Sequence, residues 1–537
     1  EIAKTSARGG FSLFIGQFLT NVLLAVASII IARLLGPESL GTYSLSFTFP
    51  TLLITITSLG IDSALVMFTA RFKGEGRNKL AREYVKAGFI FRLLMGAAGM
   101  LVCLAISDIF AEAILQRPEL ATMIKIASIW ILIMAIYNSA QSILIGLEEM
   151  GKSALMPFLG ATCKTLISPF LIILGLGVTG AVIGHILSYG IATAAGSIIL
   201  LATVTKRMGD RTAYEGETPS IIIRNMIAYS LPLYVLSLVS IIVSQFQLII
   251  LANFVPDVEI GNYTVAMNLS ALITVLTFPI STTLFPAFSK LSADRDGEEI
   301  KSLFKLSTKY SSLVIIPVST AVIILAREIV LIFYGEGYSL APPYLALYAI
   351  TFLYAGLGSL AISNFFNGIG ETRITLATGI LNAGVLIPSA YLLTKHYGVS
   401  GLIIAIIISG IASLAYGLLT AHRKFKVAPD IKNSLHIYAT SALSTIPLIA
   451  FLHTSPFNIL INTIIGTSIY LAAYLTFLPL LKAINSKDIE NLKLAFSDLK
   501  ILWPIIKPIL ACEEKILTLK GDIQKTPKFS HKPKNES

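Results

Sequence analysis

Long apolar segments dominate this sequence and constrain its fold more than any other feature. Of the 537 residues, 55% are hydrophobic and only 13% are charged, whereas soluble domains carry about 25% charged residues. Several apolar segments exceed the roughly 18 residues that suggest a bilayer-spanning helix, and the charges cluster between them. The chain is therefore predicted to be an all-α polytopic protein, crossing the cell (plasma) membrane many times.

The apolar segments predict about fourteen transmembrane helices, and the charges between them predict the topology. Basic residues gather in alternate loops, as the positive-inside rule expects, so the net charge of +11 indicates topology and no nucleic-acid partner. The intervening loops are nearly bare, with Arg117, Arg327 and Lys395 as the main exceptions and Arg33 at a helix edge. Both termini are thus predicted to be cytoplasmic. The predicted helices cover residues 10–33, 42–70, 86–107, 121–146, 153–175, 179–203, 226–251, 262–285, 308–326, 343–366, 373–394, 399–421, 435–452 and 458–481.

An internal repeat relates the two halves of the chain. Each repeat holds six predicted helices, an even number, so both halves sit in the membrane the same way up. Parallel repeats of this kind predict an alternating-access transporter with a cavity between the repeats. Three pairs of segments recur at offsets of 219 to 221 residues: 31–43 with 251–263, 151–153 with 370–372, and 177–180 with 398–401.

The repeat also sets the predicted domain organisation. Four glycines (Gly41, Gly177, Gly180 and Gly261) fall beside outer connections and are expected to serve turn geometry rather than substrate binding. The tail contains apolar stretches such as Ile501-Leu502-Trp503, and it fits either an amphipathic surface helix or a partly disordered segment. The predicted parts are an N-terminal six-helix lobe at 1–205, a cytoplasmic linker at 206–225, a C-terminal six-helix lobe at 226–422, two additional transmembrane helices at 434–482, and a cytoplasmic tail at 483–537.

Four ionisable side chains lie inside predicted helices of the first repeat: Lys164, Arg92, Asp62 and His185. A charge at the centre of a membrane helix costs about 2.5–3.5 kcal/mol, so each needs a reason. Lys164 and Arg92 would form a cationic patch for a phosphate or pyrophosphate headgroup, with Asp62 in gating or ion coupling. The alternative is an internal ion pair of Asp62 with Arg92 or Lys164. His185 is expected to be a hydrogen-bonded interhelical histidine.

Paired amide side chains complete the candidate substrate-binding set. Gln17 and Asn21 are four residues apart and share a helix face, and Asn138 and Gln141 are three apart. They would line the cavity with Lys164 and Arg92, or else link neighbouring helices. The second repeat offers mostly neutral polar groups, so the cavity walls are predicted to be unequal.

Motifs for catalysis are absent from the sequence. It has no phosphate-binding glycine loop and no zinc-ligand spacing, and the cysteines Cys103, Cys163 and Cys512 are scattered. The predicted outer connections are too short to hold an active site. We therefore expect no enzyme activity, no cofactor and no metal.

The segment from Ala32 to Ser44 reads ARLLGPESLGTYS and resembles the ARLLGPEELGLYS signature of Wzx-type polysaccharide-biosynthesis flippases. These belong to the multidrug/oligosaccharidyl-lipid/polysaccharide exporter superfamily. Leu59–Leu65, Gly177–Ala181 and Tyr334–Tyr338 resemble further stretches of that family, so the resemblance covers about residues 1–480.

The resemblance implies a V-shaped, two-lobed bundle that flips a lipid-linked oligosaccharide from the cytoplasmic to the outer leaflet. The carrier would be polyprenyl- or dolichyl-(pyro)phosphate, and the product would serve surface polysaccharide or glycoconjugate assembly. The implied partners are this glycolipid, membrane lipids and a coupling ion, H⁺ or Na⁺. The family's cationic lumen suits Arg92 and Lys164 by position.

Two departures bear on the substrate. The lipid II flippase branch carries arginines in its first helix, but none occurs here between Phe11 and Ala32, which disfavours a peptidoglycan precursor. A multidrug/cation antiporter of the same fold is the alternative function. It requires an acidic cavity, and no Asp or Glu occurs between Lys4 and Gly36. A membrane scaffold, the third possibility, would make the intramembrane charges dispensable.

Overall fold

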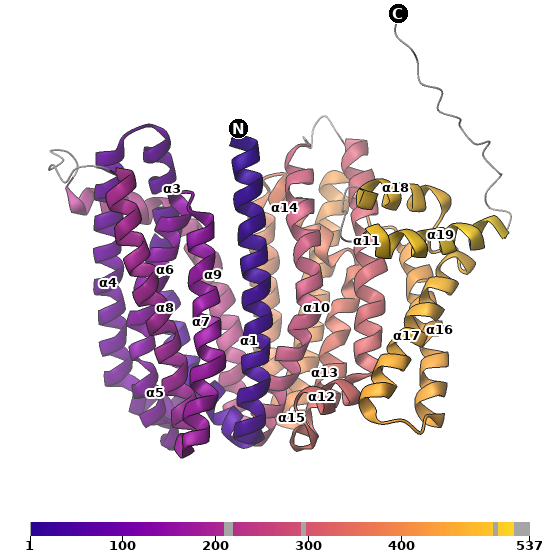
Figure 1. Ribbon diagram of the computed structural model, residues 1–537, viewed down its shortest axis with the longest axis horizontal. Helices are drawn as coiled ribbons and strands as arrows, with labels where there is room; N and C mark the ends of the chain where they lie inside the picture. The colour runs from indigo at the N-terminus through magenta and orange to yellow at the C-terminus, as the bar shows by residue number, and fades with distance from the viewer. Residues whose placement is uncertain (1, 209–217, 292–296, 498–502, 520–537) are drawn as a thin grey trace, which may run out of the picture. The chain divides into compact units, whose positions relative to one another are not determined.

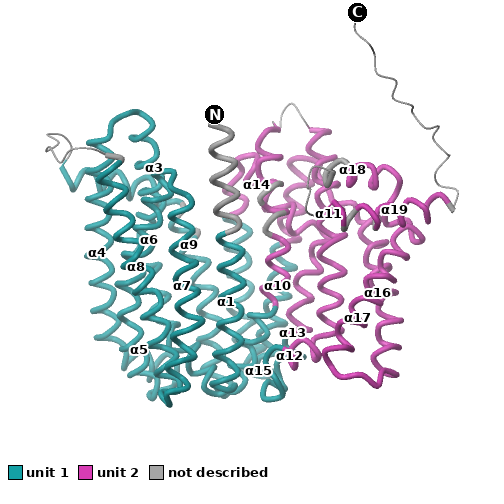
Figure 2. The backbone as a smooth tube through the Cα atoms, viewed as in Figure 1, with its two compact units in different colours: residues 1–269, 333–344, 376–413 teal, residues 270–332, 345–375, 414–537 magenta. Residues whose placement is uncertain are grey.

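The computed structural model describes residues 2–208, 218–291, 297–497 and 503–519, and within these the secondary structure is helical throughout, with no strand. Residues 209–217 of the predicted linker, and residues 498–502 and 520–537 of the predicted tail, lie outside the described residues. The chain forms two compact units (Figure 2): unit 1 holds residues 1–269, 333–344 and 376–413, and unit 2 holds the remainder. The predicted lobe boundaries stay a prediction.

Nineteen α-helices and five short 3₁₀ or π segments make up the described residues (Figure 1). The α-helices are α1 (Ile2–Ser46), α2 (Thr48–Ile56), α3 (Ile61–Gly74), α4 (Asn78–Ile109), α5 (Ala121–Ala127), α6 (Ile129–Gly146), α7 (Met150–Leu171), α8 (Gly177–Met208), α9 (Pro219–Phe254), α10 (Asp257–Ser289), α11 (Gly297–Ile324), α12 (Ala326–Phe333), α13 (Ala341–Ala349), α14 (Ser359–Gly368), α15 (Thr372–Phe425), α16 (Ile431–Thr454), α17 (Ile459–Leu480), α18 (Ser486–Ser497) and α19 (Trp503–Leu519). The short segments are η1 (Phe110–Ile114), η2 (Pro118–Leu120), η3 (Ile172–Leu176), η4 (Glu336–Tyr338) and η5 (Ile350–Leu357).

The helices fit a membrane protein of many spans. Among the described residues, 10 helices are long and apolar enough to cross a bilayer, or 11 if a bent pair is counted as one span. The predicted fourteen is not confirmed by this count. Three of the ten are 41, 57 and 54 residues long, far more than the ~20 that one crossing needs. Each contains a glycine with positive φ, at Gly36, Gly177 and Gly398, and these glycines fall between predicted helices.

The breaks at Gly177 and Gly398 make the sequence repeat visible in three dimensions. Gly177 has φ 49° and ψ −130°, and Gly398 has φ 55° and ψ −139°. Only glycine adopts this backbone readily. A Cβ atom on nearby Gly180 would lie 2.9 Å from the carbonyl group of Leu171. Turn geometry therefore explains Gly177, as predicted, whereas close backbone approach explains Gly180, which lies inside α8 without a positive φ.

Unit 1 buries an apolar core and leaves large apolar side chains on its surface. The core includes Leu65, Tyr84 and Met226, contributed by α3, α4 and α9. On α4, Leu94 and Ile109 are each 63% exposed. Side chains of this kind in such number suit contact with lipid rather than water. Their helices also satisfy the backbone polar groups internally, which the hydrocarbon layer requires.

Unit 2 carries the helices that follow the repeat. The short helices α18 and α19 lie beside each other, crosswise to α16 and α17 (Figure 1). Asp488 of α18 is buried and forms an ion pair with Lys309 of α11. Glu513 of α19 is 3% exposed, and burial raises its pKa to about 7.

Candidate functional site

The structure pairs two of the charged residues predicted inside the membrane. Arg92 of α4 is fully buried, and its Nε donates to Oδ1 of Asp62, in the first turn of α3, at 3.0 Å. Its Nη1 donates to the Thr57 carbonyl oxygen at 3.1 Å. This is the internal ion pair that the sequence left open as an alternative. Because the guanidinium is enclosed here, a role for Arg92 in binding a headgroup stays a prediction.

Lys164, on α7, is in a different situation. Its side chain is half-buried, and it makes no hydrogen bond or ion pair with any described residue. The helix is held on both sides: the Thr165 hydroxyl donates to the Leu23 carbonyl oxygen of α1, and α8 packs along the other flank. An ammonium group in a membrane helix without a counter-charge is costly. Lys164 is therefore a candidate site for an anionic ligand.

An aromatic cluster lies near Lys164 in unit 1. The Tyr43 hydroxyl and Nδ1 of His185 share a hydrogen bond of 2.9 Å, which confirms the predicted interhelical histidine. The His185 ring stacks on Tyr189 with centroids 5.0 Å apart and contacts the Trp130 ring edge-to-face. Lys164 lies close enough to His185 for an electrostatic interaction. The cluster joins the C-terminal end of α1 to α6 and α8.

The predicted amides divide into two kinds. Nε2 of Gln17 donates to Oδ1 of Asn21 at 2.9 Å, so these two side chains share a face of α1, as predicted. Asn138 and Gln141 of α6 are half-buried and make no hydrogen bond within the described residues. Membrane-embedded amides without protein partners suit a wet or ligand-lined surface. Their role as ligands stays a prediction.

A second set of residues closes one end of unit 1. The sequence did not predict this set. We call it the outer closure: residues 32–42, 114–117, 253–261 and 333–340. This end carries the glycine breaks and is predicted to face outward. Nε of Arg117 donates to Oδ1 of Asp257 at 3.1 Å, and Nη2 donates to the Val255 carbonyl oxygen at 2.9 Å. The Thr42 hydroxyl donates to the other Asp257 oxygen at 2.8 Å.

Backbone contacts at the outer closure are reciprocal between the repeats. A Cβ atom on Gly41 would lie 2.1 Å from the Asp257 carbonyl oxygen, and one on Gly261 would lie 1.8 Å from that of Pro37. Gly41 and Gly261 are 220 positions apart, and so are Pro37 and Asp257. Both glycines lie inside helices with ordinary φ. The predicted turn role is therefore wrong for these two, and close helix packing is the reason for glycine.

Two further hydrogen bonds tie the first repeat to the last residue of α12 and to the segment that follows it. The Tyr338 hydroxyl donates to the Ala32 carbonyl oxygen at 2.6 Å. Nε of Arg33 donates to the Phe333 carbonyl oxygen at 2.7 Å. Arg33 and Arg117 are among the few basic residues near the predicted outer side, and this was the sequence signal that could have indicated the outer closure. Their partners are distant in sequence, so no spacing predicts the pairing.

Residues for metal binding do not gather anywhere in the described residues, where no group of three or more His, Cys, Asp or Glu side chains could hold an ion. Cys103 is buried, Cys163 is half-buried and Cys512 is exposed, and all three are free thiols. The site chemistry consists of hydrogen bonding and charge. It can bind and release a ligand.

Comparison with known families gives two matches. Residues 6–292 match the profile of the family described as polysaccharide biosynthesis protein. Residues 232–392 match the MatE profile.

Three curated relatives have low sequence identity to this chain but align with more than half of its length. The lipid II flippase MurJ of Bacillus subtilis is 21% identical over 81% of this chain and 86% of its own length. The succinoglycan biosynthesis transport protein ExoT of Rhizobium meliloti is 25% identical over 65% of this chain and 66% of its own. A probable low-salt glycan biosynthesis flippase, Agl15 of Haloferax volcanii, is 23% identical over 62% and 66%.

Solved structures share the fold. A lipid II flippase MurJ in an inward closed conformation superposes with a TM-score of 0.72 at 17% identity, covering 91% of this chain and 99% of the other. An inward-facing multidrug resistance MATE family transporter of the MOP superfamily gives 0.66 at 20% identity, covering 76% and 94%. At these identities the likeness establishes the fold alone.

Proposed function

Because the chain belongs to the polysaccharide biosynthesis protein family, we propose that it flips a lipid-linked oligosaccharide across the cell membrane by alternating access. The glycan would travel from the cytoplasmic to the outer leaflet on a polyprenyl- or dolichyl-(pyro)phosphate, with both termini of the protein in the cytoplasm. The names of the relatives MurJ, ExoT and Agl15 support this function. The relatives are flippases and transporters, which fits a protein without covalent chemistry.

The observation that carries the proposal is the unpaired ammonium group of Lys164. A lysine held in a membrane helix without a carboxylate is stabilised when an anion arrives, and the (pyro)phosphate of the carrier supplies one. Half-buried Asn138 and Gln141, which have no hydrogen bonds in the described structure, would bond the sugar hydroxyls. Arg92, Gln17 and Asn21 complete the proposed binding set.

The outer closure supplies the other half of the mechanism. Its bonds are few and polar, and the side chains of Arg117 and Asp257 are mostly buried, at 24% and 15% exposed. The cost of desolvating both charges offsets much of their attraction, and opening returns the charges to water, so the net cost of breaking the pair is small. Opening this end while the headgroup stays on Lys164 would release the glycan outward. The Asp62–Arg92 pair is a candidate for coupling this movement to H⁺ or Na⁺.

A multidrug/cation antiporter is the second candidate, favoured by the MatE match over residues 232–392. Such a protein needs an available carboxylate to hold a cation. Asp62, the intramembrane acid that the sequence singled out for gating or ion coupling, is bonded to Arg92. The charge that remains unpaired near the aromatic cluster is the ammonium group of Lys164, which favours an anionic headgroup.

The test is the sidedness of lipid-linked oligosaccharide in a flippase-deficient host that expresses the full chain. Lys164→Ala is expected to trap the glycolipid on the cytoplasmic leaflet, and Lys164→Arg to restore part of the flipping. Lys395→Ala, at an exposed lysine, is the matched control. If Lys164→Ala reaches the membrane and flips normally, the lysine is not the headgroup site. If the parent chain flips no glycolipid but exports a cationic drug, the antiporter replaces the flippase.

A further inference from the structure

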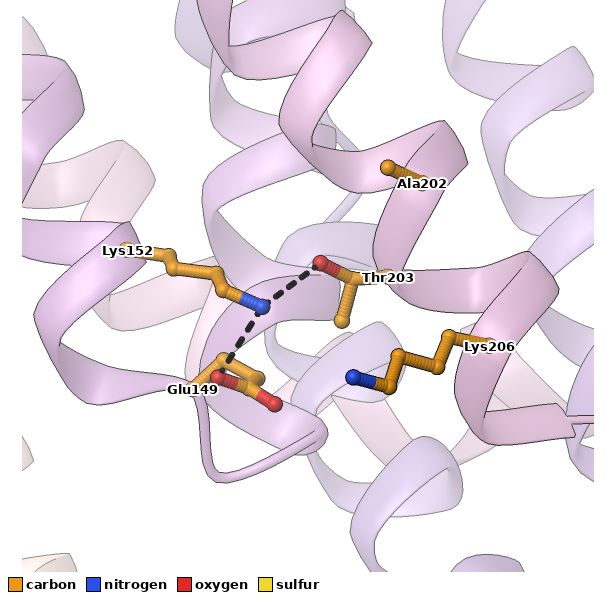
Figure 3. A pocket seen from close by; sticks show the side chains of 5 residues that line it. All are labelled: Glu149, Lys152, Ala202, Thr203 and Lys206. Atoms are coloured by element: carbon orange, nitrogen blue, oxygen red, sulfur yellow. Dashed lines mark hydrogen bonds and ion pairs between the residues drawn. The ribbon is translucent and has the colours of Figure 1, made fainter.

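A pocket of about 460 Å³ opens at the end of unit 1 opposite the outer closure. Lys152 enters it from α7, Thr203 and Lys206 enter it from α8, and Glu149 enters it from the residue before α7 (Figure 3). Its volume lies within the range of roughly 300–1,000 Å³ typical of small-ligand sites. None of these residues belongs to the binding set proposed above.

The ammonium group of Lys152 is held in place by two neighbouring side chains of the pocket. Nζ of Lys152 lies 3.1 Å from Oγ1 of Thr203 and 3.3 Å from Oε2 of Glu149. The Thr203 hydroxyl donates its own hydrogen to the Ile199 carbonyl oxygen at 2.7 Å. Thr203 can therefore only accept from Lys152, and it orients the ammonium group. Glu149 holds the same ammonium from the other side.

Lys206 is the unsatisfied member of the pocket. Its side chain is exposed and makes no hydrogen bond or ion pair with any described residue. Figure 3 shows it extending toward Lys152 and Glu149 from the opposite side of the pocket. The pocket thus offers two ammonium groups and one carboxylate, a net charge of one positive unit.

This combination of charges selects a particular chemistry. The net positive charge of the pocket attracts an anion and repels a cation, and Glu149 places a like charge beside a bare phosphate. A phosphate bonded to a sugar satisfies every group, since its oxygens accept from Lys152 and Lys206 while sugar hydroxyls donate to the Glu149 carboxylate.

The position of the pocket agrees with that ligand. Nζ of Lys73, in the last turn of α3, donates to the Leu147 carbonyl oxygen at 2.7 Å, two residues before Glu149. The pocket is therefore beside the basic end of α3, which the positive-inside rule places in the cytoplasm. In the second repeat, the residue matching Lys152 is Glu371, so the basic pocket belongs to the first repeat.

From these observations we infer that Lys152, Lys206 and Glu149 form a docking site for a glycosyl phosphate on the cytoplasmic face. The inference rests on the proposed function and deepens it: the site would capture the sugar-phosphate end of the glycolipid before it enters the membrane interior. A phospholipid headgroup or free phosphate shares part of this chemistry, and the experiment separates them through the role of Glu149.

The experiment measures binding to the full chain in phosphatidylcholine nanodiscs by calorimetry, with α-D-glucose 1-phosphate, inorganic phosphate and glucose as probes. Glucose 1-phosphate is expected to bind at least about tenfold more tightly than either other probe, the loss expected when one charge-assisted hydrogen bond is missing. Lys206→Ala should weaken it by a similar factor. Glu149→Gln should weaken glucose 1-phosphate while strengthening inorganic phosphate. Lys86→Ala, at an exposed lysine on α4, should change nothing.

Equal affinity for glucose 1-phosphate and phosphate would overturn the inference, because Glu149 would then contact no sugar. So would unchanged binding in Lys206→Ala, a variant at an exposed position that should fold normally. If the parent chain flips glycolipid but does not bind glucose 1-phosphate, the docking site is rejected and the proposed function is retained. Binding without flipping would reject the proposed function and retain the pocket.

Discussion

The outer ends of the two repeats are nearly symmetric, whereas their interiors are not. At the outer closure, Gly41 meets the backbone of residue 257 and Gly261 meets that of residue 37, each pair at one offset. In the interior, the charges belong to the first repeat. At offsets of 219 to 221, the second repeat has Ser311, Ser312 or Leu313 in the place of Arg92, and only uncharged residues in the place of Lys164.

The symmetric outer ends and the asymmetric interiors suit two different tasks, which are closing one end of the protein and recognising a ligand. Closing an end requires two similar surfaces to fit against each other, and a duplicated segment supplies them. Recognising a ligand with one charged end requires an uneven wall, so one copy keeps the charges. Symmetry should therefore mark residues that move the protein, and asymmetry should mark residues that hold its cargo.

The largest effect is expected from Arg92→Ala. Removing one partner leaves Asp62 without its counter-charge and costs roughly 3–5 kcal/mol of unfolding free energy. Ser312 donates to the Thr308 carbonyl oxygen of its own helix, and Ser312→Ala should cost about 1 kcal/mol. Denaturant unfolding in detergent measures both. Equal costs would break the claimed asymmetry of the interiors, and the double variant Arg92→Met with Asp62→Leu should recover most of the loss.

Alanine at either outer glycine should have the next largest effect. A Cβ atom at Gly41 or Gly261 would overlap a backbone oxygen, which cannot swing aside as a side chain does. Each change should destabilise the closed state by roughly 1–3 kcal/mol, and the two should be similar. Gly379→Ala is the control, since nothing lies within 4 Å of a Cβ there. Thermal unfolding of the three variants decides the point, and a large inequality between Gly41→Ala and Gly261→Ala would count against the symmetry.

Arg117→Gln should loosen the outer closure by roughly 1–3 kcal/mol, because it removes the ion-pair partner of Asp257, whose side chain is 15% exposed. A cysteine at Leu40, which is 3% exposed, would report opening through its rate of thiol labelling. Labelling should be faster in Arg117→Gln, and in the parent it should rise with salt concentration. Arg327→Gln, at an exposed arginine of α12, should label at the parental rate. No change in Arg117→Gln would show that the glycine contacts alone keep this end shut.

The smallest effect is expected outside both repeats, at Glu513 of α19. Burial raises its pKa from 4.5 to about 7, so the docked helix keeps the carboxyl neutral. Docking is then strongest below about pH 4.5, and this contribution is lost as the pH rises toward 7. Glu513→Gln should slow hydrogen exchange in α19 at pH 8 and change it little at pH 5. Flipping should be unaffected, and a pH-dependent change in flipping would tie α19 to the repeats.

Much of the fold could be predicted because it depends on short-range patterns. Apolar length predicted the membrane helices, and the offset between Gly177 and Gly398 predicted a repeat that both backbones display. The interhelical role of His185 followed from the cost of an isolated polar group among apolar helices. These inferences need only the local sequence and the properties of the bilayer.

The site was less accessible to prediction because its contacts join distant segments. Whether Asp62 would pair with Arg92 or Lys164 depends on how α3 and α4 turn against each other, which no spacing specifies. The partner of Arg117 is 140 residues away. The pocket at Lys152 depends on where α7 begins and α8 ends. The glycines at 41 and 261 were recognised, but a turn and a close crossing favour the same residue type.

The reciprocal contact at the outer closure makes a half-length chain self-complementary. The contacting oxygens belong to the backbone, which is why Pro37 and Asp257 can differ while both glycines remain. A protein of one repeat carries the glycine and the facing carbonyl four residues apart on the same stretch of chain. Two copies facing across a two-fold axis would thus shut their shared end without a single change of sequence. Fusion into one polypeptide then frees each half to diverge everywhere else.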